Sequence, residues 1–229
     1  MNQLESLGSP QIKNILLKHG VKEPLFGVKI TDMKPIQKKI KKDYQLAKDL
    51  YATGNADAMY LAGLIADDEK MTKKDLQTWV KNAVSNNINE YTVPWVAAEG
   101  QHGHTLAMEW IDSKEPHIAT AGWSTLANLA ALKPDSELDL GSFKALLTRV
   151  EKNIHSSADR VRYCMNNFVI CVGSYIVPLS ETAIAAAKRI GSVTVNMNGT
   201  ACKVPDAIDY IKKAKDKGSL GKKKKTVKC

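Results

Sequence analysis

Tyr91, Trp95 and Glu99, in the stretch Tyr91–Gln101, are the residues of this chain that point most directly to chemistry. Trp95 and Glu99 stand four residues apart, so on a helix they share one face. Pro94 favours a helix that begins here, because the missing N–H of proline costs nothing in a first turn. An aromatic face beside a carboxylate stabilises positive charge that develops in a reaction. The alternative is that Trp95 is a core residue and Glu99 a solvated one.

Other patterns that carry chemistry are weaker. His102 and His104 could be two metal ligands, but no Cys or Glu completes a recognisable set. The acidic run Asp67–Glu69 lacks the alternating ligand spacing of a calcium loop. No glycine-rich phosphate loop and no Ser–His–Asp or Cys–His nucleophile set can be assembled from the sequence. We therefore expect neither a metal nor a cofactor.

Positive charge is concentrated at the C-terminal end. The chain has a formal net charge of +9, and the stretch from Ile211 to Cys229 holds nine lysines against one acidic residue, Asp216. A lysine run such as Lys222–Lys225 is typical of a flexible tail, which we place at residues 218–229. With no amphipathic anchor beside it, the tail favours a nucleic acid over a membrane as partner.

Basic residues of the remaining chain are expected to contact DNA phosphates, the alternative for each being a solvated surface position. With the tail, the candidate phosphate contacts are Lys38, Lys39, Arg149, Lys152, Arg160, Arg162, Lys188, Arg189, Lys222, Lys223, Lys224 and Lys225. No apolar run is long enough to span a bilayer, and the first residues do not resemble a secretory signal. The four cysteines show no C-x-x-C spacing. A reducing cytoplasm is the expected location.

The elements that must position these residues are helices. Ala56–Ala66 is apolar nearly all round and predicts an inner helix, as does the largely apolar His117–Leu132. Thr72–Asp75 has the form of a capping box. Only Ser192–Val204 suggests a small hairpin or an ordered loop. Inner helices recur about every 35 to 45 residues, which predicts an all-α, HEAT-like solenoid of five to seven antiparallel pairs in one domain, residues 1–217.

Three stretches carry a resemblance to a known family. They are Phe26–Ile36 (Phe-Gly-Val-Lys-Ile-Thr-Asp-Met-Lys-Pro-Ile), Trp95–Glu99 (Trp-Val-Ala-Ala-Glu), and the helix around Arg162–Tyr175. With them the chain resembles the AlkD-type DNA alkylation repair proteins. These are HEAT-like solenoids that include DNA glycosylases removing positively charged alkylpurines.

The resemblance implies roles for three residues. Trp95 matches the first of two tryptophans, Glu99 an aspartate and Phe168 the second tryptophan, which in the enzymes contact the deoxyribose and stabilise its oxocarbenium-like charge. This chain has Glu for Asp and Phe for Trp, and it lacks the family's arginine, which aligns within Ile118–Trp123.

The resemblance implies a monomer that binds double-stranded DNA, alkylated or distorted, and associates with the nucleoid when bound. Two activities follow from it. One is an N-glycosylase that excises cationic N3- or N7-alkylpurines. The other is a non-catalytic relative that binds distorted or branched DNA. A third reading, which needs no DNA, is a helical-repeat scaffold for other proteins.

Overall fold

The most buried helices form an inner layer. The computed structural model describes all 229 residues, and its inner helices are α5 (Ala56–Ile65), α7 (Val93–Glu99), α9 (Pro116–Leu132) and α11 (Asp159–Tyr175). All ten residues of α5 are buried. The inner helices lie side by side in chain order, α5 against α7, α7 against α9 and α9 against α11. Most residues of this layer are buried, and it forms the core.

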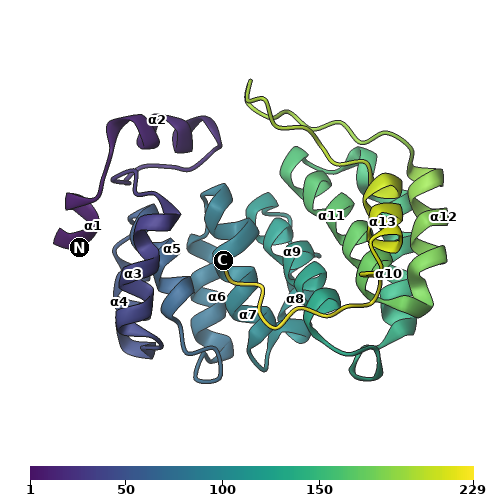
Figure 1. The fold of residues 1–229 in the computed structure, drawn as a ribbon, viewed down its shortest axis with the longest axis horizontal. Coiled ribbons are helices and arrows are strands. Elements are labelled where there is room, and N and C mark those ends of the chain that lie inside the picture. Colours follow the sequence, from purple (N-terminus) through teal and green to yellow (C-terminus); the bar gives the residue numbers. More distant parts are fainter.

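More polar helices cover the inner layer as antiparallel partners, and the pairs stack in a row (Figure 1). The partners are α4 (Tyr44–Ala52), α6 (Lys73–Asn82), α8 (Gly103–Trp110) and α10 (Leu140–Asn153), followed by the pair α12 (Ser180–Ile190) and α13 (Ala207–Asp216). The N-terminal helices are α1 (Asn2–Ser6), α2 (Pro10–Lys18) and α3 (Ile30–Ile40). Short turns complete the fold: η1 (Ile88–Thr92), η2 (Asp135–Glu137), η3 (Ile154–Ser156) and η4 (Val177–Leu179). The prediction of an all-α array of five to seven helical pairs is confirmed.

Pro94 is the second residue of α7, so its predicted place in the first turn of a helix is confirmed, but another helical turn precedes it. The π-turn η1 runs directly into α7, and the Val93 N–H donates to the carbonyl of Ile88. Proline cannot donate to the preceding turn, and its ring clashes with the carbonyl four residues back, here that of Glu90. A widened π-turn relieves this clash, and such turns are frequent at functional sites.

Two expectations for local structure have clear outcomes. The capping box is present in both directions, with the Thr72 side chain accepting from the Asp75 N–H and the Asp75 side chain accepting from the Thr72 N–H. Ser192–Val204 forms no strands, so the hairpin alternative is wrong, and the segment is a loop. Its tip is a turn in which Asn198 and Gly199 both have positive φ, 53° and 71°.

The C-terminal segment lies on the body of the protein and does not extend from it. Residues 218–229, which we call the strap, cross the C-terminal ends of α11, α9, α7 and α5 in turn (Figure 1, yellow). Donors on the strap are the amides of Gly221, Lys224 and Val227 and the ammonium of Lys228; their acceptors are Ser174, Ala131, Glu99 and Ala66. The lysine-rich sequence therefore satisfies carbonyls and partial negative charge at helix ends.

No single helix is both long and apolar enough to cross a membrane. Taken together, α11 and Val177–Ile190 meet the length and composition criteria, but they are bent by 116° at the break between them.

The motif at Phe26–Val28 is held by one buried carboxylate. Asp57, in the first turn of α5, accepts hydrogen bonds from the backbone N–H groups of Phe26 (2.6 Å), Gly27 (3.0 Å) and Val28 (3.1 Å). Gly27 has a φ of 83°, and a Cβ there would lie 2.5 Å from backbone atoms of Lys13 and Ser9. Both residues are thus required to dock the N-terminal helices onto α5.

Asp57→Asn should therefore destabilise the protein. The neutral amide can accept only some of these three hydrogen bonds, and it lacks the charge that strengthens them. We therefore expect a loss of about 2–3 kcal/mol in the free energy of unfolding. Urea denaturation measures it. Asp49→Asn on α4, whose exposed carboxylate accepts only from Gln45, is the control and should change stability by less than about 0.5 kcal/mol. Equal effects of the two changes would contradict this role of Asp57.

Candidate functional site

The structure does not bring Trp95 and Glu99 together in one open site. The Trp95 side chain is buried and packs edge-on against Tyr60, with ring centroids 5.3 Å apart. Glu99 is the last residue of α7, and its carboxylate accepts from the Thr226 hydroxyl (2.5 Å) and the Val227 N–H (2.8 Å) of the strap. Six of the seven residues of α7 are buried, so the helix has no exposed face that the two side chains could share.

Phe168 lies in the core, which corrects its placement beside a deoxyribose. The ring is 0% exposed and packs between Trp123 and Phe143, with centroid distances of 5.3 Å and 5.8 Å. No part of it is open to a ligand in this structure.

Arg160, expected at a DNA phosphate, makes a bidentate ion pair with Glu90. Its Nε and Nη2 each donate to a different carboxylate oxygen at 2.6 Å. The Glu90 side chain is only 4% exposed and that of Arg160 25%. Burial raises the pKa of Glu90, and the hydrogen bonds from Arg160 oppose that rise. The guanidinium also lies over the Tyr163 ring, 4.4 Å from its centroid. The charge of Glu90 is thus compensated inside the fold.

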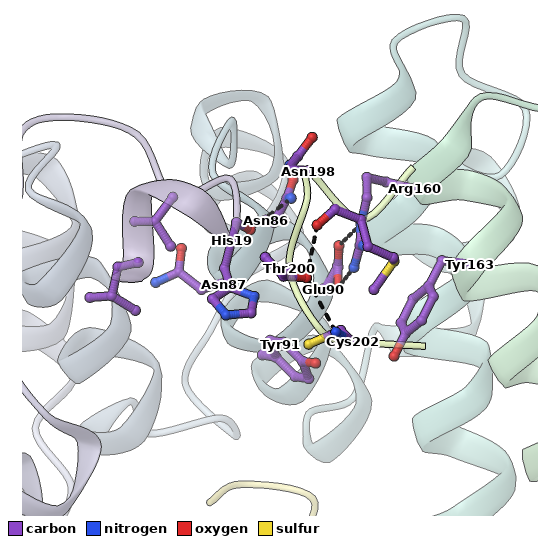
Figure 2. Close-up of a pocket in the computed structure, with 13 residues that line it drawn as sticks. His19, Asn86, Asn87, Glu90, Tyr91, Arg160, Tyr163, Asn198, Thr200 and Cys202 are labelled. Atoms are coloured by element: carbon purple, nitrogen blue, oxygen red, sulfur yellow. Dashed lines mark hydrogen bonds and ion pairs between the residues drawn. The ribbon is translucent and has the colours of Figure 1, made fainter. Parts of the chain in front are cut away.

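This ion pair belongs to a pocket of about 250 Å³ between α2, η1, the start of α11 and the 192–204 loop (Figure 2). We call it the aromatic pocket. Its lining combines rings, amides and the ion pair: Tyr91, Tyr163, His19, Asn86, Asn87, Asn198, Glu90 and Arg160. Tyr91 is 45% exposed. The Asn87 Oδ1 is buried without a hydrogen-bond partner. The pocket therefore offers the open aromatic face of Tyr91.

The aromatic pocket contains the residue types that the family resemblance implied, drawn from other positions. It has two aromatic rings, a carboxylate and an arginine, whereas the sequence assigned these roles to Trp95, Phe168 and Glu99 and found no arginine. Glu90 and Arg160 are 70 residues apart in the chain, and no local spacing relates them. No signal in the sequence alone identifies this pair.

The other predicted arginines also have protein partners. Arg149 donates to the Ile111 carbonyl at 2.9 Å and pairs with Asp112 at 2.7 Å. Arg162 donates to carbonyls of Thr194 and Ser157, at 2.8 Å and 3.0 Å. Arg189 makes a bidentate pair with Glu151, which raises the pKa of Arg189. These arginines hold neighbouring elements together.

The predicted lysines divide into two groups. Lys223 is held by the Ala130 carbonyl and by Asp135, both at 2.9 Å. The others are exposed and make no ion pair: Lys38, Lys39, Lys152, Lys188, Lys222, Lys224 and Lys225. Only this second group is free for an anionic partner.

Comparison with known proteins decides the family. The model of the family described as "DNA alkylation repair enzyme" matches residues 1–211. This chain belongs to that family. Similar family members include Uncharacterized protein Lin0241 of Listeria innocua, 34% identical over 94% of this chain and 95% of the relative. Uncharacterized protein Lmo0209 of Listeria monocytogenes is 33% identical over the same shares.

A solved structure agrees with this chain throughout. It has a TM-score of 0.92 and 38% sequence identity, covering 100% of this chain and 97% of the other. It is described as "A new family of proteins related to the HEAT-like repeat DNA glycosylases with affinity for branched DNA structures". The predicted HEAT-like fold is thus confirmed.

Arg160→Met tests the buried ion pair. The change leaves Glu90 buried without a partner, so we expect a loss of about 3–5 kcal/mol in the free energy of unfolding at neutral pH. It also removes the group that opposes the rise in the pKa of Glu90 above 4.5. The Arg160→Met variant should therefore be more stable at acid pH, and it should lose stability as the pH rises through the pKa of Glu90 in the folded protein.

Urea denaturation of Arg160→Met at pH 5 and pH 7.5 measures both effects. Glu90→Gln combined with Arg160→Met removes the unpaired charge, so it should recover part of the stability and abolish the added pH dependence. A pH-independent loss in the single variant would show that the pair contributes packing and not charge.

Proposed function

We propose that this member of the DNA alkylation repair family binds branched or distorted DNA and does not excise bases. The observation that carries the proposal is the bidentate Glu90–Arg160 pair in the aromatic pocket, at 2.6 Å for both hydrogen bonds. Stabilising an oxocarbenium-like sugar requires negative charge that is free to act where positive charge develops. Glu90 is compensated by Arg160, and Glu99 accepts from the strap. Neither carboxylate is poised for that chemistry.

The affinity for branched DNA structures described for the similar solved protein supports the binding half of the proposal. The likeness extends over the whole chain at 38% identity, so it includes the elements that form the aromatic pocket.

The pocket has the chemistry to recognise a nucleotide that has left a duplex. Bases at a branch point or distortion lose stacking or pairing more easily than bases inside a regular duplex, which show no open face. The exposed ring of Tyr91 offers a stacking surface, and stacking is tolerant of sequence because every base has a π-face. The Asn86 and Asn87 amides border the same space. Exposed lysines would supply the sequence-independent attraction to the phosphate backbone.

Tyr91→Ala should reduce the preference for branched DNA. Stacking of one base on an aromatic side chain is worth about 1–3 kcal/mol, so we expect affinity for a four-way junction to fall about 5- to 150-fold. Affinity for linear duplex should change little. Tyr210→Ala is the matched control, since Tyr210 on α13 is 53% exposed and lies outside the pocket. Gel-shift titrations of each variant measure both affinities, and equal effects on junction and duplex would contradict stacking by Tyr91.

A base-release assay tests the absence of excision. We expect no release of 7-methylguanine or 3-methyladenine from methylated DNA above the uncatalysed background, from the wild type or from Glu99→Gln. Release by the wild type that falls in Glu90→Gln or Glu99→Gln, while DNA binding persists, would overturn this half of the proposal.

A further inference from the structure

A second charged surface lies at the opposite end of the inner helices from the aromatic pocket. It is a groove of about 590 Å³ between the end of α3 and the strap, lined by Lys34, Lys38, Lys41, Lys42, Lys228, Asp68 and Glu99. We call it the lysine groove. Glu90 lies in η1 and Glu99 ends α7, so along this continuous segment the two sites are separated by about 14 Å. A single small ligand could not occupy both.

Positive charge in the lysine groove exceeds what the protein compensates. Asp68 is its shared carboxylate, 2.6 Å from the Lys228 ammonium and 3.8 Å from that of Lys42. Lys34, Lys38 and Lys41 make no ion pair. Five lysines thus face two carboxylates, a formal excess of three positive charges. Such an excess raises the local positive potential and attracts a polyanion.

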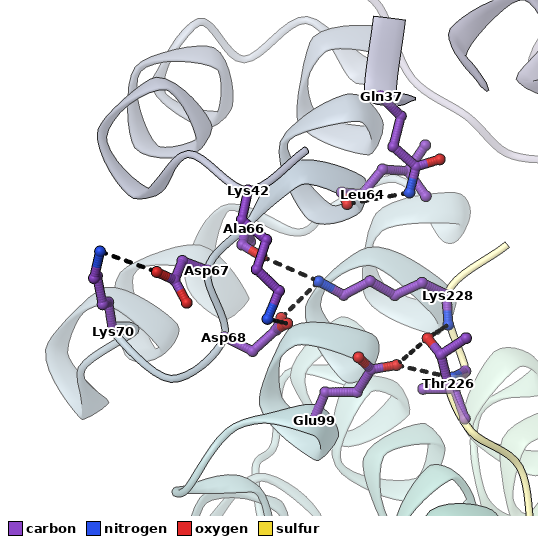
Figure 3. Close-up of polar contacts among 11 residues, drawn as sticks. Gln37, Lys42, Leu64, Ala66, Asp67, Asp68, Lys70, Glu99, Thr226 and Lys228 are labelled. Carbon is purple, nitrogen blue, oxygen red and sulfur yellow. Dashed lines mark hydrogen bonds and ion pairs between the residues drawn. The ribbon is translucent and has the colours of Figure 1, made fainter. Parts of the chain in front are cut away.

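The strap completes the groove (Figure 3). Thr226 and Lys228 form one wall, and Val227 packs against the apolar core. The Lys228 side chain is only 9% exposed and donates to the Ala66 carbonyl at 3.3 Å. The Thr226 hydroxyl and the Val227 N–H both donate to one oxygen of the Glu99 carboxylate. The strap therefore fixes this carboxylate at the edge of the groove and adds the Lys228 cation to its lining.

We infer that the lysine groove binds the phosphodiester backbone of a DNA duplex arm, separately from the nucleotide held in the aromatic pocket. The inference rests on the proposed function and deepens it. Flexible lysines bind phosphates as point charges without reading sequence. The arms of a branched DNA leave the junction in different directions, so sites at opposite ends of the inner helices contact two arms of one junction.

Lys34→Gln with Lys38→Gln in the full-length protein is the first test. Lys41 is left unchanged because its φ of 65° makes substitution there ambiguous. If both lysines contact phosphates, the slope of log K against log salt for a four-way junction becomes shallower by up to about 1.8, and affinity falls about tenfold or more. Lys212→Gln with Lys213→Gln, on α13 at the far end of the array, removes the same charge and should leave junction binding within about twofold.

Asp68→Asn is the second test, because it should change junction affinity in the opposite direction from the lysine variants. It raises the excess charge of the groove, so junction affinity should increase, whereas a variant that merely loosened the strap would bind more weakly. Unchanged or weaker binding in Asp68→Asn, with unchanged binding in the double lysine variant, would overturn the inference. If the wild type does not prefer a junction over duplex at all, the proposed function fails; if it prefers the junction but neither variant alters binding, only the lysine groove is refuted.

Discussion

The inner helices of this protein are buried on nearly every side, and this constraint determines where polar chemistry can lie. α5 has no exposed residue, and α7 is buried except at Glu99. Because α5, α7, α9 and α11 lie side by side with the same direction, their ends collect at two edges of the array. The strap crosses the C-terminal edge, where lysines suit the partial negative charge of helix ends. The aromatic pocket lies at the other edge.

The π-turn at Ile88–Thr92 connects the buried inner helix α7 to the aromatic pocket. A regular helix through Pro94 would bring the proline ring against the Glu90 carbonyl. The widened turn that avoids this clash contains both Glu90 and Tyr91, which line the aromatic pocket. Glu90 then needs the Arg160 guanidinium, since an unpaired buried carboxylate is strongly destabilising. The π-turn and the buried Glu90–Arg160 ion pair thus form one pocket, in which the Tyr91 ring is exposed and the Glu90 charge is compensated.

The helical array could be predicted from the sequence because its signals are local. The all-round apolar character of Ala56–Ala66 and the capping box at Thr72 give helix positions and burial without long-range information. The site could not be predicted in the same way. A four-residue spacing places Trp95 and Glu99 on one side of a helix, but it does not say whether that side faces solvent, another helix or the strap.

Arg160 and the lysine tail were named from the sequence, but their partners in the fold were missed because those partners are distant in the chain. Arg160 looks like a surface cation in sequence, and only the fold brings it to Glu90. The lysine tail has the composition of a flexible arm, yet four helix ends supply carbonyl and carboxylate partners for it. Composition cannot reveal such partners, because they come from α5, α7, α9 and α11.

The central claim is that the aromatic pocket, with its compensated charge and open aromatic face, binds branched DNA in preference to a linear duplex. The most direct measurement is the ratio of the wild-type Kd values for a linear duplex and for a four-way junction of the same sequence and total length, at matched ionic strength from low to physiological salt. The account predicts that the junction is bound more tightly throughout, and that the preference persists at physiological salt because stacking is not screened. Equal Kd values, or a preference that disappears as salt rises, would contradict it.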